Sequence, residues 1–304
     1  MRAADAYVHI SNDELQNFVR IADDEGLGAG EEPKQRAFKN VLRVLEALAI
    51  DGVVLIGERA PPIVKRIHAA NNLLFRPEDQ REGGVHLGAF LFRDLFSRMS
   101  VPLIFGSPHI DFFKIIDLSD YQKAWLAESP GDVARLTDQA ADLLDFGYGW
   151  MEFGHGRSLD PRGDSLIFRS HVQLEAAAAT ATGAYDYRGT VQSALLGSEL
   201  AIKAGLAARG LGDDELKDFG HNQKKAAKKL SELEENFEVD RVTRVITLFP
   251  DYVKSRYAGA PPDRIETGHI LMGAQYIASE VTRLFSDRNL RKANPDMPQR
   301  SYPA

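Results

Sequence analysis

A succession of amphipathic helices separated by sharp breaks occupies the last third of the chain, residues 187–285. Within it, segment 191–206 repeats apolar side chains at the spacing of one helical face, and Glu199 lies inside that apolar stripe. Gly210 and Gly212 then end the helix, as glycine commonly does. Such helices bury their apolar faces by packing against one another, so the pattern predicts a mainly α fold.

Composition narrows the class of protein. A chain of 304 residues has room for two modest domains or one large one. A net charge of −7 argues against coating nucleic acid by bulk electrostatics, although a local basic patch is compatible with it. The absence of cysteine excludes disulfides, thiolate metal ligands and a cysteine nucleophile, and it fits a reducing cytoplasm. No apolar core of a signal peptide and no membrane-spanning run is present, so we expect a soluble, cytoplasmic protein with no membrane partner.

Local patterns predict further helices before residue 150. Residues 11–14, Ser-Asn-Asp-Glu, have the pattern of a helix N-cap, and residues 36–50 form a strong apolar stripe. Pro61 and Pro62 are placed to open another helix. The aromatic-rich segment 87–99 is also predicted to be helical.

Composition shifts predict four parts of the chain. We expect a mostly helical N-terminal domain of unknown role over residues 1–150 and a Gly/Asp-rich linker over 151–169. A helical bundle should follow over 170–287, and a flexible tail rich in Asn, Pro and Arg over 288–304. The bundle should bury seven side chains: Leu195, Leu206, Leu230, Val245, Leu248, Ile277 and Leu284. Glu199 should meet a cation or hydroxyl inside it, from Arg244, Arg256 or Tyr257.

Three short motifs follow one another in the C-terminal third. They are Glu-Leu-Ala-Ile-Lys-Ala at 199–204, Gly-His at 220–221 and Ser-Arg-Tyr at 255–257. Their order resembles the HEPN superfamily of small helical bundles. The resemblance implies an up-and-down bundle, a homodimer, and an RNA- or nucleotide-associated role in a bacterial stress or defence system of the toxin–antitoxin kind.

Arg264 and His269 match the Arg–His pair with which catalytic HEPN proteins cleave RNA without a metal. The imidazole can move a proton and the guanidinium can stabilise charge on the phosphoryl oxygens. The pattern is short, however, because Arg81 and His86 also match it outside the bundle. Residue 265 is also Ile where active members carry a polar residue. We therefore favour a binding or scaffolding module, with a metal-independent endoribonuclease as the alternative.

A basic cluster and two nearby motif residues are candidates for RNA or ligand binding. The spacing of the cluster places four lysines on one broad helical face that could follow a phosphate backbone. A solvated helix balanced by Glu232, Glu234 and Glu235 is the competing interpretation. His221 precedes this helix and is placed either to cap it or to contact a ligand, and we favour the structural role. The candidate binding residues are Lys224, Lys225, Lys228, Lys229, His221, Arg256 and Tyr257.

Two groups of carboxylates suggest metal binding at first sight. Gly-Ser at 106–107, followed by Asp117 and Asp120, resembles minimal nucleotidyltransferases, but two residues separate these carboxylates where that family has one. Three further carboxylates, Asp138, Asp142 and Asp145, have helical spacing, which fits either a divalent-ion site or, as we prefer, a solvated acidic face. We expect no metal site and no cofactor. The aromatic and glycine-rich stretch 145–156 suits either a stacking platform for bases or packing at a domain interface.

Overall fold

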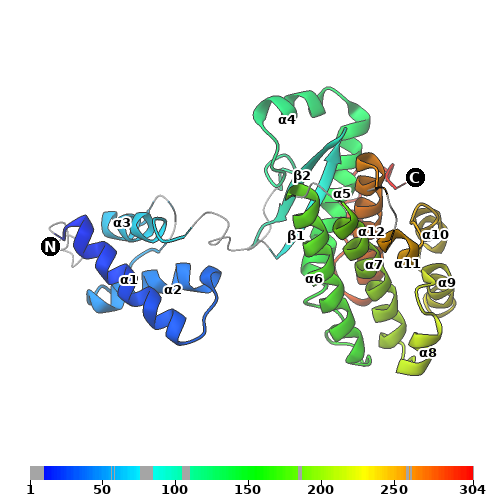
Figure 1. Ribbon diagram of the computed structural model, residues 1–304, viewed down its shortest axis with the longest axis horizontal. Helices are drawn as coiled ribbons and strands as arrows, with labels where there is room; N and C mark the ends of the chain where they lie inside the picture. Colours follow the sequence, from blue (N-terminus) through cyan, green and yellow to red (C-terminus); the bar gives the residue numbers. More distant parts are fainter. Residues whose placement is uncertain are drawn as a thin grey trace. The chain divides into compact units, whose positions relative to one another are not determined.

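The chain forms two compact units, Met1–Gly83 and Gly84–Ala304 (Figure 1). Both are built mainly from helices, which confirms the predicted mainly α fold, and the described part of the chain contains one two-stranded sheet. The computed structural model describes residues 10–55, 57, 59–75, 85–104, 110–183, 187–257, 260 and 262–303.

The first unit packs three helices: α1 (Asn12–Gly28), α2 (Pro33–Ala47) and α3 (Pro62–Asn71). The predicted N-cap is present, since Ser11 Oγ accepts from Glu14 N at 3.2 Å while Ser11 N donates to the Glu14 carboxylate at 2.9 Å. Each helix contacts the other two through an apolar core that includes Leu15, Val19, Val41, Leu45, Ile63 and Ile67.

The helix predicted over residues 87–99 is wrong. These residues belong to an antiparallel hairpin of β1 (His86–Phe92) and β2 (Leu95–Val101), and Arg93 turns the chain with a φ of 59°. Residues 88–92 are all buried, so both faces of β1 are covered and the apolar run lacks an alternating period. A short run of this kind cannot be distinguished from a buried helix by periodicity.

Four long helices form the body of the second unit: α5 (Pro130–Gly149), α6 (Arg162–Gly183), α7 (Arg188–Ala208) and α12 (Arg264–Phe285). α12 contacts α5 and α7, and α7 packs along α6, while β1 lies against α5, α6 and α12 (Figure 1). The shorter helices are α4 (Asp120–Ala127), α8 (Asp213–Asp218), α9 (Gln223–Leu233), α10 (Val239–Thr247), α11 (Tyr252–Arg256) and α13 (Leu290–Ala293).

Small residues bring α6 and α7 close together. Ser170 Oγ donates to the carbonyl of Gly197 at 2.7 Å, and a Cβ at Gly197 would lie 2.8 Å from the Leu174 side chain. The alanine tract of α6 contributes to the same contact, since Ala177, Ala178 and Ala181 are buried. These side chains lose little conformational entropy on burial, so the pair packs tightly at low cost.

Side chains from the helices complete the hydrogen bonding of β1. Gln275 of α12 accepts from the Ala89 amide and donates to the Ala89 carbonyl, both at 2.9 Å. Glu175 of α6 accepts from the Leu87 amide at 3.0 Å. A buried strand edge would otherwise leave these peptide groups without partners, so the two side chains fix the hairpin to the bundle.

The expected domain boundary near residue 150 is wrong, because the division falls between residues 83 and 84. The hairpin and α5 belong to the bundle through their contacts with α12. The predicted linker 151–169 lies within the second unit: Phe153 is buried, Gly154 N donates to the Phe285 carbonyl at 2.8 Å, and α6 begins at Arg162. The glycines of this stretch serve tight turns, since Gly154 and Gly156 have φ near 70°.

The predicted flexible tail also needs correction. Leu290 N donates to Asp145 at 2.8 Å, and the amides of Ser301 and Tyr302 donate to Asp138 at 2.9 and 2.8 Å. These bonds fasten residues 290–303 to α5. Asn, Pro and Arg content suggested a loose end, but buried acceptors on α5 satisfy its backbone.

Most of the predicted bundle core is confirmed. Leu195, Leu206, Leu230, Val245 and Ile277 are buried, whereas Leu284 is half-buried and Leu248 is 59% exposed. Leu248 follows the last residue of α10, where the apolar stripe of that short helix has ended. Among the described residues, no helix has the length and apolar character needed to cross a bilayer.

Candidate functional site

The three carboxylates of α5 are buried and bound by arginines. Asp142 accepts from Arg283 at 2.6 Å and from Arg300 at 2.9 Å, and Asp145 accepts from Arg283 at 2.7 Å. Asp138 forms an ion pair with Arg291. The preferred prediction of a solvated acidic face is therefore wrong, since all three residues are at most 3% exposed.

Burial and charge together set the ionisation of this cluster. Burial lowers the pKa of Arg283, but the carboxylates of Asp145, Asp142 and Glu280 outweigh that effect, so the pKa of Arg283 lies above its usual value. Burial raises the pKa values of Asp145 and Glu280 in spite of the nearby Arg283 guanidinium. The arginines remain charged, and their ion pairs with the α5 carboxylates hold them in place.

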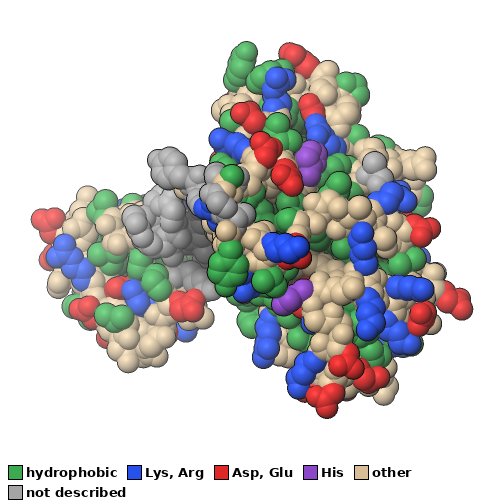
Figure 2. Space-filling view, turned by 45° about the vertical axis from the view of Figure 1, so that its right-hand side comes forward, with side chains coloured by type: hydrophobic (Ala, Val, Ile, Leu, Met, Phe, Trp, Pro, Cys, Tyr) green, Lys and Arg blue, Asp and Glu red, His purple; other side chains and the backbone are tan. Residues whose placement is uncertain are grey.

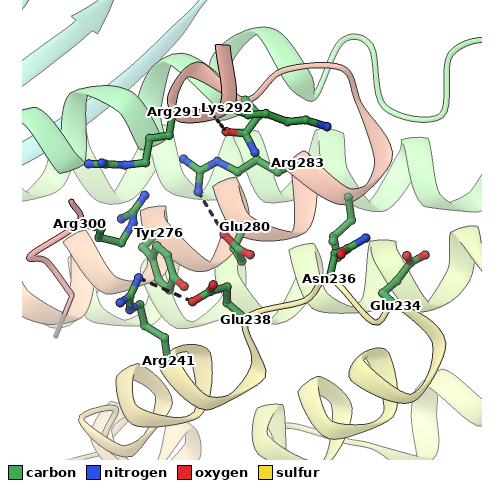
Figure 3. Close-up of a pocket in the computed structure, with 12 residues that line it drawn as sticks. Glu234, Asn236, Glu238, Arg241, Tyr276, Glu280, Arg283, Arg291, Lys292 and Arg300 are labelled. Atoms are coloured by element: carbon green, nitrogen blue, oxygen red, sulfur yellow. Dashed lines mark hydrogen bonds and ion pairs between the residues drawn. The ribbon is translucent and has the colours of Figure 1, made fainter. Parts of the chain in front are cut away.

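These arginines form one wall of a cavity of about 710 Å³ between α10, α12 and the segment around α13 (Figure 3). Arg241 and Glu238, from the start of α10, face Tyr276 and Glu280 of α12 across it. Five cationic side chains line this arginine cavity, against three carboxylates. The cations are Arg241, Arg283, Arg291, Lys292 and Arg300, and the carboxylates are Glu234, Glu238 and Glu280.

Three buried polar atoms in the walls of the arginine cavity have no hydrogen-bond partner among the described residues. They are Nε of Arg241, Nε of Arg291 and the hydroxyl oxygen of Tyr276. Burial, followed by the charges of Glu280 and Asp142, raises the pKa of Tyr276, so its hydroxyl stays protonated. Unpaired buried polar atoms of this kind are costly.

The structure does not bring Arg264 and His269 together within one chain. They lie on α12, where five positions place them about 140° apart around the helix axis. The Arg264 guanidinium lies over the rings of Phe96 and Tyr187, 5.9 and 5.8 Å from their centroids. Nδ1 of His269 lies 3.1 Å from the Tyr302 hydroxyl. Burial, and then the charge of Arg135, lowers the pKa of His269.

The predicted lysine face lies on α9. Lys224, Lys225 and Lys228 are exposed, Lys225 lies over the ring of Phe219, and Lys229 pairs with Glu232 at 3.0 Å. On the face shown in Figure 2, basic and acidic side chains are interspersed. Of the four lysines, Lys229 thus has the acidic neighbour that the solvated-helix interpretation expects.

A second pocket, of about 410 Å³, collects some of the predicted binding residues. His221, Lys224 and Tyr252 line it, and the His221 ring lies 4.4 Å from that of Tyr252. Arg256 contacts Tyr252 and donates to Gln192 at 2.7 Å, whereas Tyr257 is exposed. The site has the stacking rings and the cation that a base with a phosphate requires, but Asp251 also lines it.

Glu199 is buried as predicted, with different partners. It accepts from Lys203 at 2.7 Å and lies 2.8 Å from Nδ1 of His221, instead of meeting Arg244, Arg256 or Tyr257. His221 thereby links α7 to the start of α9. Lys203 lies one turn along α7 from Glu199, so this partner could have been found from helical spacing.

The nucleotidyltransferase-like motif gains no support. Residues 106–107 lie outside the described residues, and Asp117 and Asp120 are both exposed. The Asp117 amide extends the pairing of the hairpin by donating to the Arg98 carbonyl at 2.8 Å. Arg81, of the second Arg–His match, also lies outside the described residues.

Sequence reasoning missed the residues of the arginine cavity. The helical spacing of the three α5 aspartates and the arginines of the C-terminal segment were visible signals, but nothing in the sequence pairs them. Comparison with models of protein families found no match, and comparisons with curated proteins and with solved structures found no significant match.

Proposed function

We propose that this chain is a binding module for a phosphate-bearing ligand, a nucleotide or an RNA end, which it holds in the arginine cavity. One observation carries the proposal: five cationic side chains line one cavity, and buried carboxylates anchor three of them from behind. The resemblance of segments 199–204, 220–221 and 255–257 to HEPN proteins independently suggests an RNA- or nucleotide-associated role, in a bacterial stress or defence system.

Anchoring makes these arginines suitable for phosphate. A guanidinium offers five N–H donors, and a carboxylate bound on one edge leaves others available. Because Asp138 and Asp142 fix Arg291 and Arg300 in advance, a ligand would lose less free energy in ordering them. Glu238 and Glu280 would then accept hydrogen bonds from ribose hydroxyls or base amino groups, which explains why carboxylates share the cavity.

Titration calorimetry with nucleoside mono-, di- and triphosphates and a 5′-phosphorylated RNA oligonucleotide tests this proposal. Arg241→Gln and Lys292→Gln remove cations from the cavity without removing an anchored arginine. Each substitution should weaken binding about ten- to hundredfold, since a hydrogen bond to a charged group contributes about 1.5–3 kcal/mol. The matched control, Lys224→Gln with Lys228→Gln, changes the α9 lysine face and should leave affinity within about twofold at fixed salt.

The results of these titrations distinguish the arginine cavity from the α9 lysine face. Loss of binding in the control, with the cavity variants unaffected, would move the ligand to α9 and refute the arginine cavity. An RNA oligonucleotide that binds equally well without its terminal phosphate would contradict recognition of an end. Absence of measurable binding by every phosphate probe would refute the proposal as a whole.

Metal-independent RNA cleavage by Arg264 and His269 is the second candidate. The lowered pKa of His269 favours it, because an imidazole that is neutral at pH 7 can accept a proton. Within one chain the two side chains face different partners, so the candidate requires a homodimer in which Arg264 of one copy approaches His269 of the other. Incubation with total RNA and EDTA tests it: His269→Ala should abolish cleavage, and wild-type protein that leaves RNA intact refutes it.

A further inference from the structure

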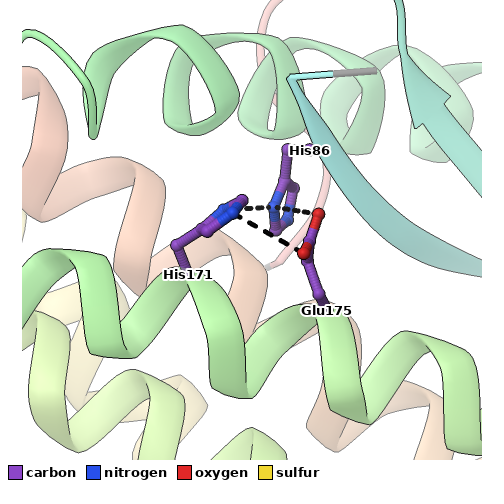
Figure 4. A group of neighbouring side chains, drawn as sticks. All are labelled: His86, His171 and Glu175. Carbon is purple, nitrogen blue, oxygen red and sulfur yellow. Dashed lines mark hydrogen bonds and ion pairs between the residues drawn. The ribbon is translucent and has the colours of Figure 1, made fainter. Parts of the chain in front are cut away.

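Two histidines and a glutamate meet in the interior of the second unit, away from the arginine cavity (Figure 4). His86 is the first residue of β1, whereas His171 and Glu175 lie one turn apart on α6. Nδ1 of His86 lies 3.0 Å from Nδ1 of His171 and 3.9 Å from a carboxylate oxygen of Glu175. Nε2 of His171 lies 3.6 Å from the other oxygen of Glu175.

The packing around the rings directs their nitrogens towards one another. The His171 ring stacks on Trp150, with centroids 4.5 Å apart and an interplanar angle of 23°. The His86 ring meets Phe146 edge to face at 5.0 Å. The Leu87 amide holds the Glu175 carboxylate at 3.0 Å. The backbone of β1 and the aromatic wall therefore fix three ligand-type side chains before any ion binds, which lowers the cost of binding one.

A single proton between the two imidazoles cannot bind all of these ligand atoms at once. A proton between the two Nδ1 atoms is bonded covalently to only one of them and forms a single hydrogen bond with the other. A metal ion accepts both lone pairs and the carboxylate at the same time.

The distances suit a transition-metal ion. Metal–nitrogen bonds of about 2.0–2.1 Å place two imidazole nitrogens about 3.0–3.4 Å apart on one ion. The observed separation of 3.0 Å falls in that range. The ligand atoms of the three side chains all lie within 4.8 Å of one another. The carboxylate therefore has to approach by up to about 1.5 Å. The Glu175 side chain, 36% exposed, has solvent beside it. The solvent side leaves room for water as a further ligand.

We propose that His86, His171 and Glu175 bind a first-row transition-metal ion, with Zn²⁺ the ion that best suits two imidazoles, one carboxylate and water. Neutral nitrogen donors disfavour Mg²⁺ and Ca²⁺, which prefer oxygen. The site departs from the expectation that the chain binds no metal. The two histidines are separated by 85 positions, so they do not form a recognisable motif in the sequence.

Metal binding to tag-free, full-length protein tests the proposal. After EDTA treatment and its removal, equilibrium dialysis against micromolar Zn²⁺ should leave about one equivalent per chain, measured by mass spectrometry of the metal. Co²⁺ should give visible absorption bands that Zn²⁺ removes. Neither a Zn²⁺ stoichiometry nor a Co²⁺ spectrum depends on any activity of the protein.

Two variants and one control locate the ion. His171→Gln should abolish stoichiometric binding, and Glu175→Gln, a change at a partly exposed side chain, should weaken it about tenfold or more. His155→Gln changes an exposed histidine outside the cluster and should bind like the wild type. If His171→Gln fails to fold, the Glu175→Gln titration and the wild-type Co²⁺ spectrum decide the matter. Substoichiometric binding by the wild type, or binding unchanged in Glu175→Gln, would overturn the proposal.

Discussion

Nη2 of Arg283 lies 2.6 Å from Oδ1 of Asp142, although 141 positions separate the two residues in the chain. The same carboxylate accepts from Arg300, so it holds both the end of α12 and the C-terminal segment against α5. Asp142 is fully buried. Asp142 therefore helps to position both arginines in the wall of the cavity, and Asp145 binds Arg283 as well.

Asp142→Asn should lower the free energy of unfolding by about 3–5 kcal/mol, because it leaves Arg283 and Arg300 incompletely paired in the interior. Urea unfolding followed by tryptophan fluorescence measures this loss. Both tryptophans, Trp125 and Trp150, belong to the second unit, so the signal reports that unit alone.

Asp213→Asn is the matched control for this change. Its carboxylate also meets an arginine, Arg162, at 3.2 Å, but the side chain is 73% exposed. Stability should change by no more than about 0.5 kcal/mol. Equal effects of the two substitutions would show that burial does not govern the strength of these pairs.

Gln275→Met should destabilise the second unit by at least about 2 kcal/mol at nearly constant side-chain volume. It removes the acceptor of the Ala89 amide and the donor to the Ala89 carbonyl, and each buried group left unpaired costs about 1–3 kcal/mol. Amide hydrogen exchange should also become faster at Ala89. Unchanged exchange there would mean that another group satisfies the edge of β1.

Gly268→Ala should destabilise the protein even though alanine is the better helix former. A Cβ at this position of α12 would lie 2.5 Å from the side chain of Leu91 on β1, and such overpacking costs about 1–3 kcal/mol. Gly183→Ala, at the end of α6 with open space around its Cβ, should instead be neutral or gain up to about 1 kcal/mol. The opposite order of the two midpoints of urea unfolding would refute this account.

His269 should make stability depend on pH. Its pKa in the folded protein is lowered by burial and by Arg135, so the unfolded chain takes up the proton first as pH falls. The stability that neutral His269 contributes is complete above the unfolded pKa of about 6.5. It is lost as pH falls through the lower pKa of the folded protein. His269→Gln should therefore reduce the decline in the urea midpoint between about pH 7.5 and 5.5. An identical decline in the variant would contradict either the direction of the pKa shift or its assignment to His269.

Local chemistry explains which helices could be predicted from the sequence. The cap at Ser11 depends on side chains three positions apart, and the apolar face of α7 repeats within one helix, so both are present in the sequence itself. The hairpin of β1 and β2 was missed because helices cover both faces of β1 and erase its alternation.

The sites were less predictable than the helices. The α5 aspartates were recognised as a group, but the competing interpretations were a metal site and a solvated face, and neither included Arg283, Arg291 or Arg300. A carboxylate in the sequence does not reveal whether water, a metal or a guanidinium will face it. That depends on which distant segment packs beside it.

The sequence alone determined the mainly α class, the helix caps and breaks, and the burial of Glu199, because each depends on contacts within a few turns of one chain segment. Tertiary structure alone decided the division after residue 83, the anchoring of residues 290–303 and the meeting of His86 with His171. These depend on pairs of residues far apart in the chain, whose approach is fixed by how whole helices pack and by the cost of leaving buried polar groups unpaired.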